Sequence, residues 1–222
     1  MPPPNKKHLR LYGHVLCPFV ERVRLVLCAK GLKYQDVQVN LEKRTRWHYT
    51  LNGGFVPILQ APGENDQEHT LLFESRIIGD YLDAAYKENP LYFEDPLKRA
   101  MQHHLMTIMD SLPVGLFATM MTRGQLESEL IKLTKCLEKL DLALKESKTV
   151  YFLDAENITM VECHGFPFIA RLFHLKSSPN PEFQQLYQDF LRIDERFPKL
   201  YRWFKTLMEN PAFDGNRSVE TP

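Results

Sequence analysis

The sequence predicts an α/β domain followed by an all-helical domain. Three observations support this fold class: apolar residues alternate in short segments early in the chain, they recur at helical spacing later, and a proline- and acid-rich segment separates the two parts. The 222 residues are enough for two modest domains, since domains usually hold about 100 to 200 residues.

The chain is expected to begin with a strand, a helix and a second strand. Residues 9–12 and 34–41 show the alternation that is typical of strands. Between them, residues 17 to about 30 carry apolar side chains at helical spacing, and Gly31 ends this helix. Because a strand, helix and strand of this length usually form a right-handed crossover, we expect the two strands to pair in parallel.

A hairpin is expected next. Residues 52–54 are Asn-Gly-Gly, a turn signal, and residues 55–60 form a short apolar run in which Pro57 marks a strand edge. The polar residues 61–69 form a turn before the apolar residues 70–73. This pattern predicts two antiparallel strands.

A helix that opens at Glu74 and Ser75 is expected to close the first domain. Residues 87–95 are then rich in proline, acid and asparagine, which predicts a linker between domains at 1–86 and 96–222. The apolar stripe of the closing helix comprises Ile77, Ile78, Tyr81, Leu82 and Ala85.

The second domain is helical in pattern throughout. Thr159 and Glu162 fit a capping box, and Pro198 and Pro211 bracket a last helix. Leucines three or four residues apart predict core packing in a helix bundle: Leu126, Leu130, Leu133, Leu137, Leu140 and Leu144.

The charges of the chain balance, with 28 lysines and arginines against 28 aspartates and glutamates. Such a chain has no general attraction for nucleic acid or for an anionic membrane. No apolar run approaches the roughly 20 residues that span a bilayer, and residues 1–8 lack the apolar stretch of a signal peptide. We therefore expect a cytoplasmic protein with no nucleic-acid partner and no stable membrane insertion.

Cys17 is the strongest candidate for chemistry, because it lies where the first expected helix begins. Amides without a helical acceptor and the positive end of the helix dipole favour a thiolate there, and Pro18 suits the first helical position. No second cysteine follows at the spacing of a dithiol motif, so a mixed disulfide at Cys17 would need a thiol from solution. A small buried residue at a helix start is the alternative.

All four cysteines are expected to be thiols, because the cytosol keeps thiols reduced, and Cys28 is expected to serve packing. Cys28 lies eleven residues along the same helix, about 16 Å from Cys17 at 1.5 Å per residue, which is beyond disulfide reach. Cys163 adjoins His164, but neighbours on a helix point in different directions and no second pair has metal-ligand spacing. We expect no metal.

Three blocks of the first half resemble the omega-class glutathione transferases, in their residues and in their spacing. Gly165-Phe166-Pro167-Phe168 in the second half is similar to a proline-interrupted aromatic helix of that class. The three blocks are Cys17-Pro18-Phe19-Val20-Glu21-Arg22-Val23-Arg24-Leu25-Val26-Leu27, Val56-Pro57-Ile58-Leu59 and Phe73-Glu74-Ser75.

The resemblance implies the glutathione transferase fold, a thioredoxin-like N-terminal domain followed by an all-helical C-terminal domain, usually as a homodimer. It also implies glutathione as co-substrate, in thiol transfer, dehydroascorbate reduction and glutathione transfer. Cys17 would form a mixed disulfide with glutathione, in place of the tyrosine or serine by which most other classes stabilise the glutathione thiolate.

Four residues of the matched blocks would hold glutathione. Val56 would pair its backbone with the cysteinyl part, and Pro57 after it would be cis. A strand-edge proline is the alternative for Pro57. Glu74 and Ser75 would hold the γ-glutamyl end, since a helix N-terminus with a hydroxyl suits a carboxylate while Glu74 can face the ammonium.

Three further residues match less specific positions of the class. Arg44 falls where a lysine often reaches the glycyl carboxylate, and a solvated surface arginine is the alternative. Phe168 and Arg171 match positions near the acceptor pocket. The segment before Val56 is one residue shorter than in better-known members, and its two glycines predict a mobile loop.

Two other functions remain open. The chloride intracellular channel family shares the fold and a Cys-Pro-Phe site but can move onto membranes, and the lack of a long apolar segment counts against it. A non-catalytic binding module on the same fold is the second alternative, because a fold alone does not prove activity. The presence of Cys17, Val56-Pro57 and Glu74-Ser75 argues against a decayed site.

Overall fold

The computed structural model describes residues 9–63, 69–113, 115, 117 and 127–213. Within these residues the chain divides into two compact units. The first extends to Pro90 and includes Pro211–Phe213, and the second is Leu91–Asn210. We describe each unit by itself.

The division between the units lies inside the segment 87–95 that we expected to be a linker. Leu91 and Tyr92 are buried, and the Leu91 carbonyl accepts hydrogen bonds from the Met160 amide at 2.9 Å and from Gln102 Nε2 at 3.0 Å. These contacts tie the segment to the second unit from Leu91 onward. The division also differs from our expectation at residues 211–213, which group with the first unit.

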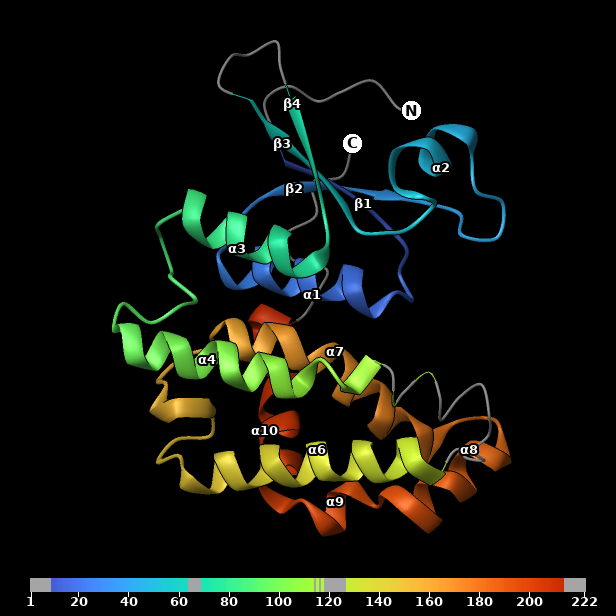
Figure 1. Cartoon of the computed structure of the whole chain (residues 1–222), viewed down its shortest axis with the longest axis vertical. Helices are drawn as coiled ribbons and strands as arrows, with labels where there is room; N and C mark the ends of the chain where they lie inside the picture. Colours follow the sequence, from blue (N-terminus) through green and yellow to red (C-terminus); the bar gives the residue numbers. More distant parts are fainter. Residues whose placement is uncertain (1–8, 64–68, 114, 116, 118–126, 214–222) are drawn as a thin grey trace. The chain divides into compact units, whose positions relative to one another are not determined.

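The first unit is built on a four-stranded sheet with the order β2-β1-β3-β4 (Figure 1). Its elements are β1 (Leu9–Gly13), α1 (Pro18–Ala29), β2 (Tyr34–Gln38), α2 (Arg46–Asn52), β3 (Ile58–Pro62), β4 (His69–Phe73) and α3 (Ser75–Ala85). β1 pairs with β2 in parallel, whereas β3 pairs antiparallel with both β1 and β4. The predicted crossover unit and hairpin are therefore confirmed. Helices α1 and α3 lie side by side on one face of the sheet (Figure 1).

A buried lysine joins α1 to the end of α3. Lys30 Nζ donates to Asp83 Oδ1 at 2.8 Å and to the carbonyls of Glu88 and Asn89 at 3.0 and 3.1 Å. All three hydrogens of the ammonium thus have acceptors, as a buried charge requires. Gly31 follows with a φ of 67° and ends α1 at the predicted place.

One helix of the first unit was not predicted, and one predicted apolar stripe is narrower than expected. The polar stretch before the hairpin contains a helix, α2, which ends at Gly53 in the left-handed conformation. The apolar stripe of α3 is narrower than expected: Ile78 and Leu82 are fully buried, but Ile77 is 56% exposed and Ala85 is exposed. Only the residues on the side of α3 that faces α1 and the sheet are buried.

The second unit is built from helices, and its described residues contain no strand. Its elements are α4 (Pro96–Met109), α6 (Glu127–Glu146), η1 (Phe152–Asp154), α7 (Met160–His174), η2 (Leu175–Ser177), α8 (Pro181–Leu186), η3 (Tyr187–Leu191), α9 (Ile193–Arg196) and α10 (Pro198–Met208). The predicted leucines of α6 are buried, except that Leu126 lies outside the described residues. Leu200, Trp203, Phe204 and Leu207 of α10 are buried as well, which confirms the last helix.

The predicted capping box at the start of α7 is present. Thr159 Oγ1 accepts from the Val161 amide at 3.2 Å, and the Glu162 carboxylate accepts from the Thr159 amide at 2.9 Å. Glu162 is fully buried and also accepts from the Phe152 amide at 3.1 Å and from Trp203 Nε1 at 3.4 Å. One carboxylate therefore joins the start of α7 to η1 and α10.

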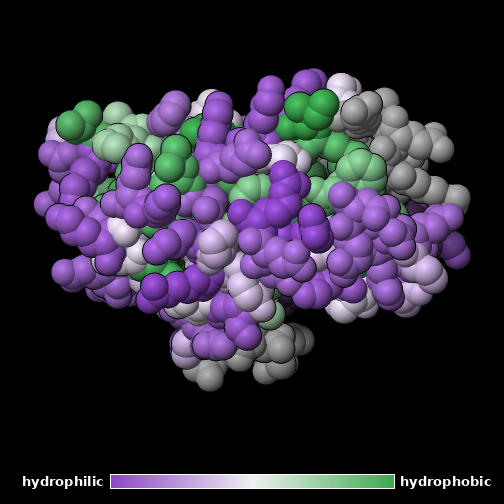
Figure 2. Space-filling view, turned by 90° about the horizontal axis from the view of Figure 1, so that it is seen from below, coloured by the Kyte–Doolittle hydropathy of each residue, from purple (hydrophilic) through white to green (hydrophobic). Residues whose placement is uncertain are grey.

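Hydrophilic residues cover most of the face shown in Figure 2, and hydrophobic residues appear there in separate groups. Within the part of the chain that the structure describes, no helix is both long and apolar enough to cross a membrane. The same part contains no group of three or more histidine, cysteine, aspartate or glutamate side chains arranged to hold a metal ion.

Candidate functional site

Cys17 is the residue that caps the N-terminus of α1. Its backbone is extended, with φ −79° and ψ 118°, and Pro18 occupies the first helical turn. The Cys17 amide donates to the His14 carbonyl at 3.0 Å, and the Cys17 carbonyl accepts the first helical bond from Glu21 at 3.0 Å. The thiol is half-buried. The turn and the proline thus fix a partly exposed sulfur at the helix start.

The Cys17 side chain lies at the N-terminal end of α1. The Cys17 side chain makes no capping hydrogen bond. The amides of the first turn nevertheless lack acceptors within the helix, and together with the aligned peptide dipoles they give its N-terminus a partial positive charge. Reactive cysteines of other proteins often occupy such helix starts.

The other three cysteines lie in less accessible places. Cys136 and Cys163 are buried, and burial raises the pKa of the Cys136 thiol. Cys28 is half-buried on α1. None of the four cysteines forms a disulfide. Among them, Cys17 alone combines partial exposure with a helix N-terminus.

A pocket of about 140 Å³ brings four of the predicted glutathione-binding residues together. Val56 and Pro57 reach it from the loop before β3, and Glu74 and Ser75 reach it from the start of α3. The Val56–Pro57 peptide bond is cis, as the resemblance implied. We call this site the small pocket; its described lining residues are Phe19, Asn52, Phe55, Val56, Pro57, Glu74 and Ser75.

Cys17 and Arg44 do not belong to this described lining. Phe19, two residues after Cys17 on α1, does. Arg44 is exposed, and its side chain lies against Gly54, where an added Cβ would come within 2.6 Å of Arg44 Cδ. A glycine at position 54 therefore leaves room for the arginine beside the loop that leads to Val56.

The start of α3 has an unusual backbone. Glu74 caps the helix with φ 65° and ψ 114°, a conformation that non-glycine residues rarely adopt. Such outliers often occur where a site needs one side chain in one direction. Ser75, the next residue, is 5% exposed, and its Oγ accepts a hydrogen bond from Arg22 Nη1 at 3.1 Å.

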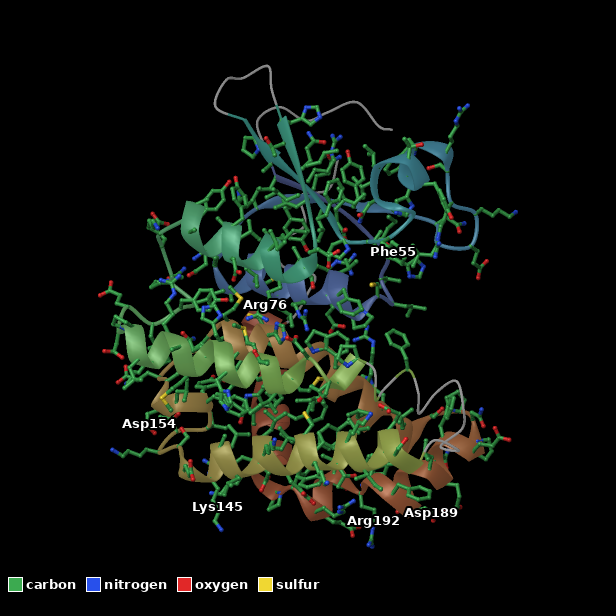
Figure 3. The ribbon with its side chains drawn as sticks, in the orientation of Figure 1. Phe55, Arg76, Lys145, Asp154, Asp189 and Arg192 are labelled. Atoms are coloured by element: carbon green, nitrogen blue, oxygen red, sulfur yellow. The ribbon has the colours of Figure 1, made fainter. Side chains whose placement is uncertain are left out.

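Helix α2 anchors the loop before Val56. His48 Nε2 lies 2.9 Å from the Phe55 carbonyl, and Asn52 Nδ2 donates to the same oxygen at 3.3 Å. Gly53 and Gly54 have positive φ and let the chain turn sharply from α2 into this loop. Phe55 itself is 68% exposed and is labelled in Figure 3.

Comparison with known proteins identifies the family. Residues 11–90 match the family described as the N-terminal domain of glutathione S-transferase, and residues 108–211 match the C-terminal domain. Glutathione S-transferase omega-1 of Sus scrofa is 30% identical over 207 residues, which cover 92% of this chain and 78% of that protein. The chain belongs to the omega class of the glutathione S-transferases.

Solved structures agree with the predicted fold of this omega-class enzyme. A glutathione transferase family member from Pseudomonas fluorescens pf-5, solved with two glutathione bound, has a TM-score of 0.79 at 18% identity, covering 99% of this chain and 96% of that one. Dehydroascorbate reductase from Chlamydomonas reinhardtii has a TM-score of 0.71 at 18% identity, covering 96% and 94%. The glutathione transferase fold predicted from the sequence is confirmed.

The acceptor residues proposed for this omega-class enzyme lie on α7. Phe168 is fully buried. Arg171 is half-buried and donates from Nη1 to the Pro167 carbonyl at 2.7 Å. The assignment of both residues to an acceptor pocket stays a prediction.

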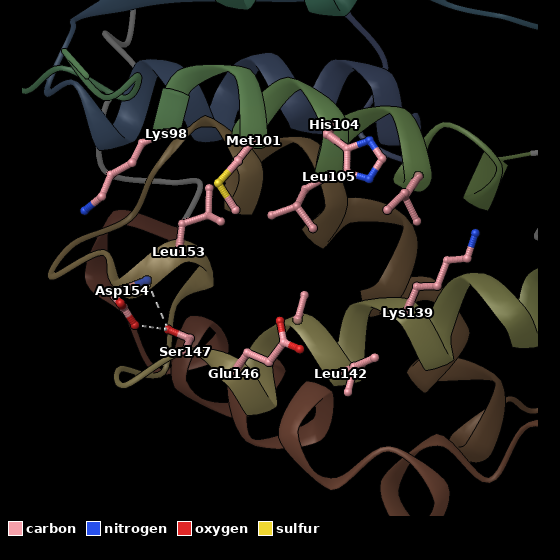
Figure 4. Close-up of a pocket in the computed structure, with 12 residues that line it drawn as sticks. Lys98, Met101, His104, Leu105, Lys139, Leu142, Glu146, Ser147, Leu153 and Asp154 are labelled. Atoms are coloured by element: carbon pink, nitrogen blue, oxygen red, sulfur yellow. Dashed lines mark hydrogen bonds between the residues drawn. The ribbon is translucent and has the colours of Figure 1, made fainter. Parts of the chain in front are cut away.

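A larger cavity of about 410 Å³ lies in the second unit of the transferase, between α4, α6 and η1 (Figure 4). Its apolar lining includes Met101 and Leu142, and at one end Ser147 and Asp154 are joined by hydrogen bonds (Figure 4). Neither Phe168 nor Arg171 is among its described lining residues. The sequence did not predict this cavity, because its lining comes from separate segments of the chain that only the tertiary structure brings together.

Sequence reasoning also missed three residues of the small pocket, Phe19, Asn52 and Phe55. Phe19 lay inside a matched block, so its place beside the site could have been inferred from its distance to Cys17 along the chain. The other two depend on α2, whose existence was not predicted.

Proposed function

We propose that this omega-class enzyme is a glutathione-dependent thiol transferase and dehydroascorbate reductase in which Cys17 forms a mixed disulfide with glutathione. One observation carries the proposal: a partly exposed cysteine caps α1, in the same unit as a small pocket formed by Val56, cis-Pro57, Glu74 and Ser75. The Chlamydomonas reductase, which has the same fold, is consistent with the proposed reduction.

The thiol transfer is a sequence of two disulfide exchanges. The Cys17 thiolate attacks the glutathionyl sulfur of a mixed disulfide, the acceptor leaves as a thiolate that takes up a proton, and a Cys17–glutathione disulfide remains. A second glutathione, as its thiolate, attacks the glutathionyl sulfur of this disulfide. Oxidised glutathione leaves and the Cys17 thiolate is restored. In the reduction of dehydroascorbate, Cys17 and one glutathione supply the two electrons and two protons and are left joined as the Cys17–glutathione disulfide, and a second glutathione then releases oxidised glutathione and restores Cys17.

The small pocket would orient glutathione for these exchanges. We propose that the Val56 backbone pairs with the cysteinyl part, while Glu74 faces the ammonium and Ser75 the carboxylate of the γ-glutamyl end. Arg44, exposed beside Gly54, would reach the glycyl carboxylate. Glutathione is the co-substrate, and the proposed chemistry needs no metal.

The remaining sequence-based expectations stay predictions. They are the homodimer, the cytoplasmic location, and an acceptor site near Phe168 and Arg171. The omega-class family match favours the enzyme over the channel-like protein and the non-catalytic module.

Substituting Ser75 tests the glutathione assignment. Ser75→Ala should raise the KM for glutathione about 10-fold with little change in kcat, because the lost hydrogen bond to a charged carboxylate holds glutathione but takes no part in bond exchange. Steady-state kinetics with dehydroascorbate and with hydroxyethyl disulfide would measure both constants. Ser111→Ala, an exposed serine of the second unit, is the matched control.

The outcomes separate two parts of the proposal. A wild-type protein that reduces neither acceptor with glutathione would contradict the function. Normal activity together with an unchanged KM in Ser75→Ala would contradict only the role of the small pocket.

A further inference from the structure

Arg22 is a buried cation behind the small pocket. It lies on α1, is 5% exposed, and does not belong to the described lining of the pocket. It nevertheless contacts two residues that do. Its Nη1 donates to Ser75 Oγ at 3.1 Å, and its guanidinium carbon lies 5.6 Å from the centre of the Phe19 ring. We propose that Arg22 is a positioning residue that makes Ser75 selective for a carboxylate.

The hydrogen-bonding capacity of the two groups sets the direction of the Ser75 hydroxyl. A guanidinium has donors only, so Ser75 Oγ must be the acceptor in this contact. A serine hydroxyl has one hydrogen of its own, and with Arg22 bonded to one lone pair that hydrogen must point elsewhere. Because Ser75 lines the small pocket, the hydroxyl can direct its hydrogen toward a ligand there. The ligand group that it recognises is then an acceptor.

The charge of Arg22 adds to this preference. A donor that bonds to the oxygen polarises the hydroxyl and strengthens its own donation. Ser75 is also the first residue of the 11-residue helix α3, whose N-terminus favours an anion. The polarised Ser75 hydroxyl and the helix N-terminus together favour a carboxylate over a neutral group. Glu74, which is exposed at the start of α3, can then face the ammonium of the γ-glutamyl residue.

This inference rests on the proposed function, since it identifies the recognised group as the α-carboxylate of the γ-glutamyl residue. Arg22 acts through Ser75 and does not touch the reacting sulfur in this scheme. Its loss should therefore change selectivity between ligands with and without that carboxylate.

Two probes isolate the carboxylate. One is S-methylglutathione, and the other is its analogue with γ-aminobutyrate in place of γ-glutamate, which lacks only the α-carboxylate. Calorimetric titration of the full chain gives a Kd for each, and their ratio measures the preference. We expect wild type to prefer S-methylglutathione by at least about 10-fold, and Arg22→Met to lose most of this preference.

A double variant tests whether Arg22 acts through Ser75. Ser75→Ala alone should lower the preference, and adding Arg22→Met to it should lower it no further. Arg24→Met is the matched control, because Arg24 is also buried on α1 but pairs with Asp36, at 2.9 Å. This control should keep the wild-type preference even if it is less stable.

Three results would overturn the inference. One is an Arg22→Met protein that binds both probes more weakly by the same factor, which is the result of a purely structural role. Another is a further loss of preference in the double variant. The third result applies if Arg22→Met does not fold. Arg22→Gln then replaces it, because it removes the charge and keeps most of the side chain. An unchanged preference for S-methylglutathione in Arg22→Gln would overturn the inference. If the wild-type protein binds neither probe, both this inference and the proposed function are contradicted.

Discussion

Replacing Cys17 with alanine is expected to lower the glutathione-dependent turnover of dehydroascorbate and of hydroxyethyl disulfide by at least about 1000-fold. Both reactions pass through a disulfide on this sulfur in the proposed scheme, and no other described cysteine combines exposure with a helix start. Binding of S-methylglutathione should persist, because the small pocket stays intact. Steady-state assays and calorimetric titration would measure the two properties separately.

Cys28→Ala is the matched control for this prediction. Cys28 lies on the same helix and is similarly half-buried, so its removal disturbs α1 to a comparable degree. We expect it to retain turnover near that of wild type. Undiminished turnover in Cys17→Ala would show that the nucleophile lies elsewhere.

Replacing Glu162 with alanine is expected to lower the free energy of unfolding by about 3 to 5 kcal/mol. The carboxylate accepts from the amides of Thr159 and Phe152 and from Trp203 Nε1. Alanine leaves these buried donors without their acceptor, at a cost of about 1 to 3 kcal/mol for each unsatisfied group, partly offset by relaxation. Urea denaturation followed by tryptophan fluorescence would measure the change.

Glu138→Ala is the control for the loss of a glutamate. Glu138 is exposed on α6 and lies 3.9 Å from Arg196, a surface pair that contributes about 0 to 1 kcal/mol. A loss of stability in Glu162→Ala no larger than in this control would contradict the role of Glu162 in joining α7, η1 and α10.

The same residue gives a prediction for pH. Burial raises the pKa of Glu162 above its ordinary value of 4.5 and outweighs the hydrogen bonds, which lower it. The folded state therefore binds this proton more tightly than the unfolded state, so this contribution to stability falls as pH rises above 4.5. Glu162→Gln has no such proton. The stability difference between wild type and this variant should shift toward the variant as pH rises, and a shift in the opposite direction would contradict the direction of the pKa.

Local sequence signals predicted the position of the candidate nucleophile. Cys17 precedes a proline and an apolar helical pattern, and both signals act within one turn, so the helix start could be read from neighbouring residues. The capping box of Thr159 and Glu162 was predictable for the same reason. The parallel pairing of β1 with β2 followed from the length and type of the segment between them.

Helix α2 escaped prediction because long-range contacts stabilise it. Its Trp47 packs against Tyr12 of β1 with ring centres 5.7 Å apart, and His48 bonds to the Phe55 carbonyl. A seven-residue segment is too short to be helical by itself, so tertiary partners such as these hold it. For the same reason, the sequence did not predict that Asn52 and Phe55 line the small pocket.

Side-chain direction was the other limit. Arg22 and Ser75 are 53 residues apart, and nothing local to either predicts their hydrogen bond. Phe168 occupies a family position associated with the acceptor, but on α7 it points into the core. Sequence position alone therefore identified the elements of the site more reliably than the orientation of their side chains.

Mapping the glutathione adduct tests the central claim most directly. The protein, first fully reduced, is exposed to oxidised glutathione under native conditions, and the modified peptides are identified by mass spectrometry. The account predicts one glutathione per chain, attached to Cys17. An adduct found mainly on Cys28, Cys136 or Cys163 would contradict it.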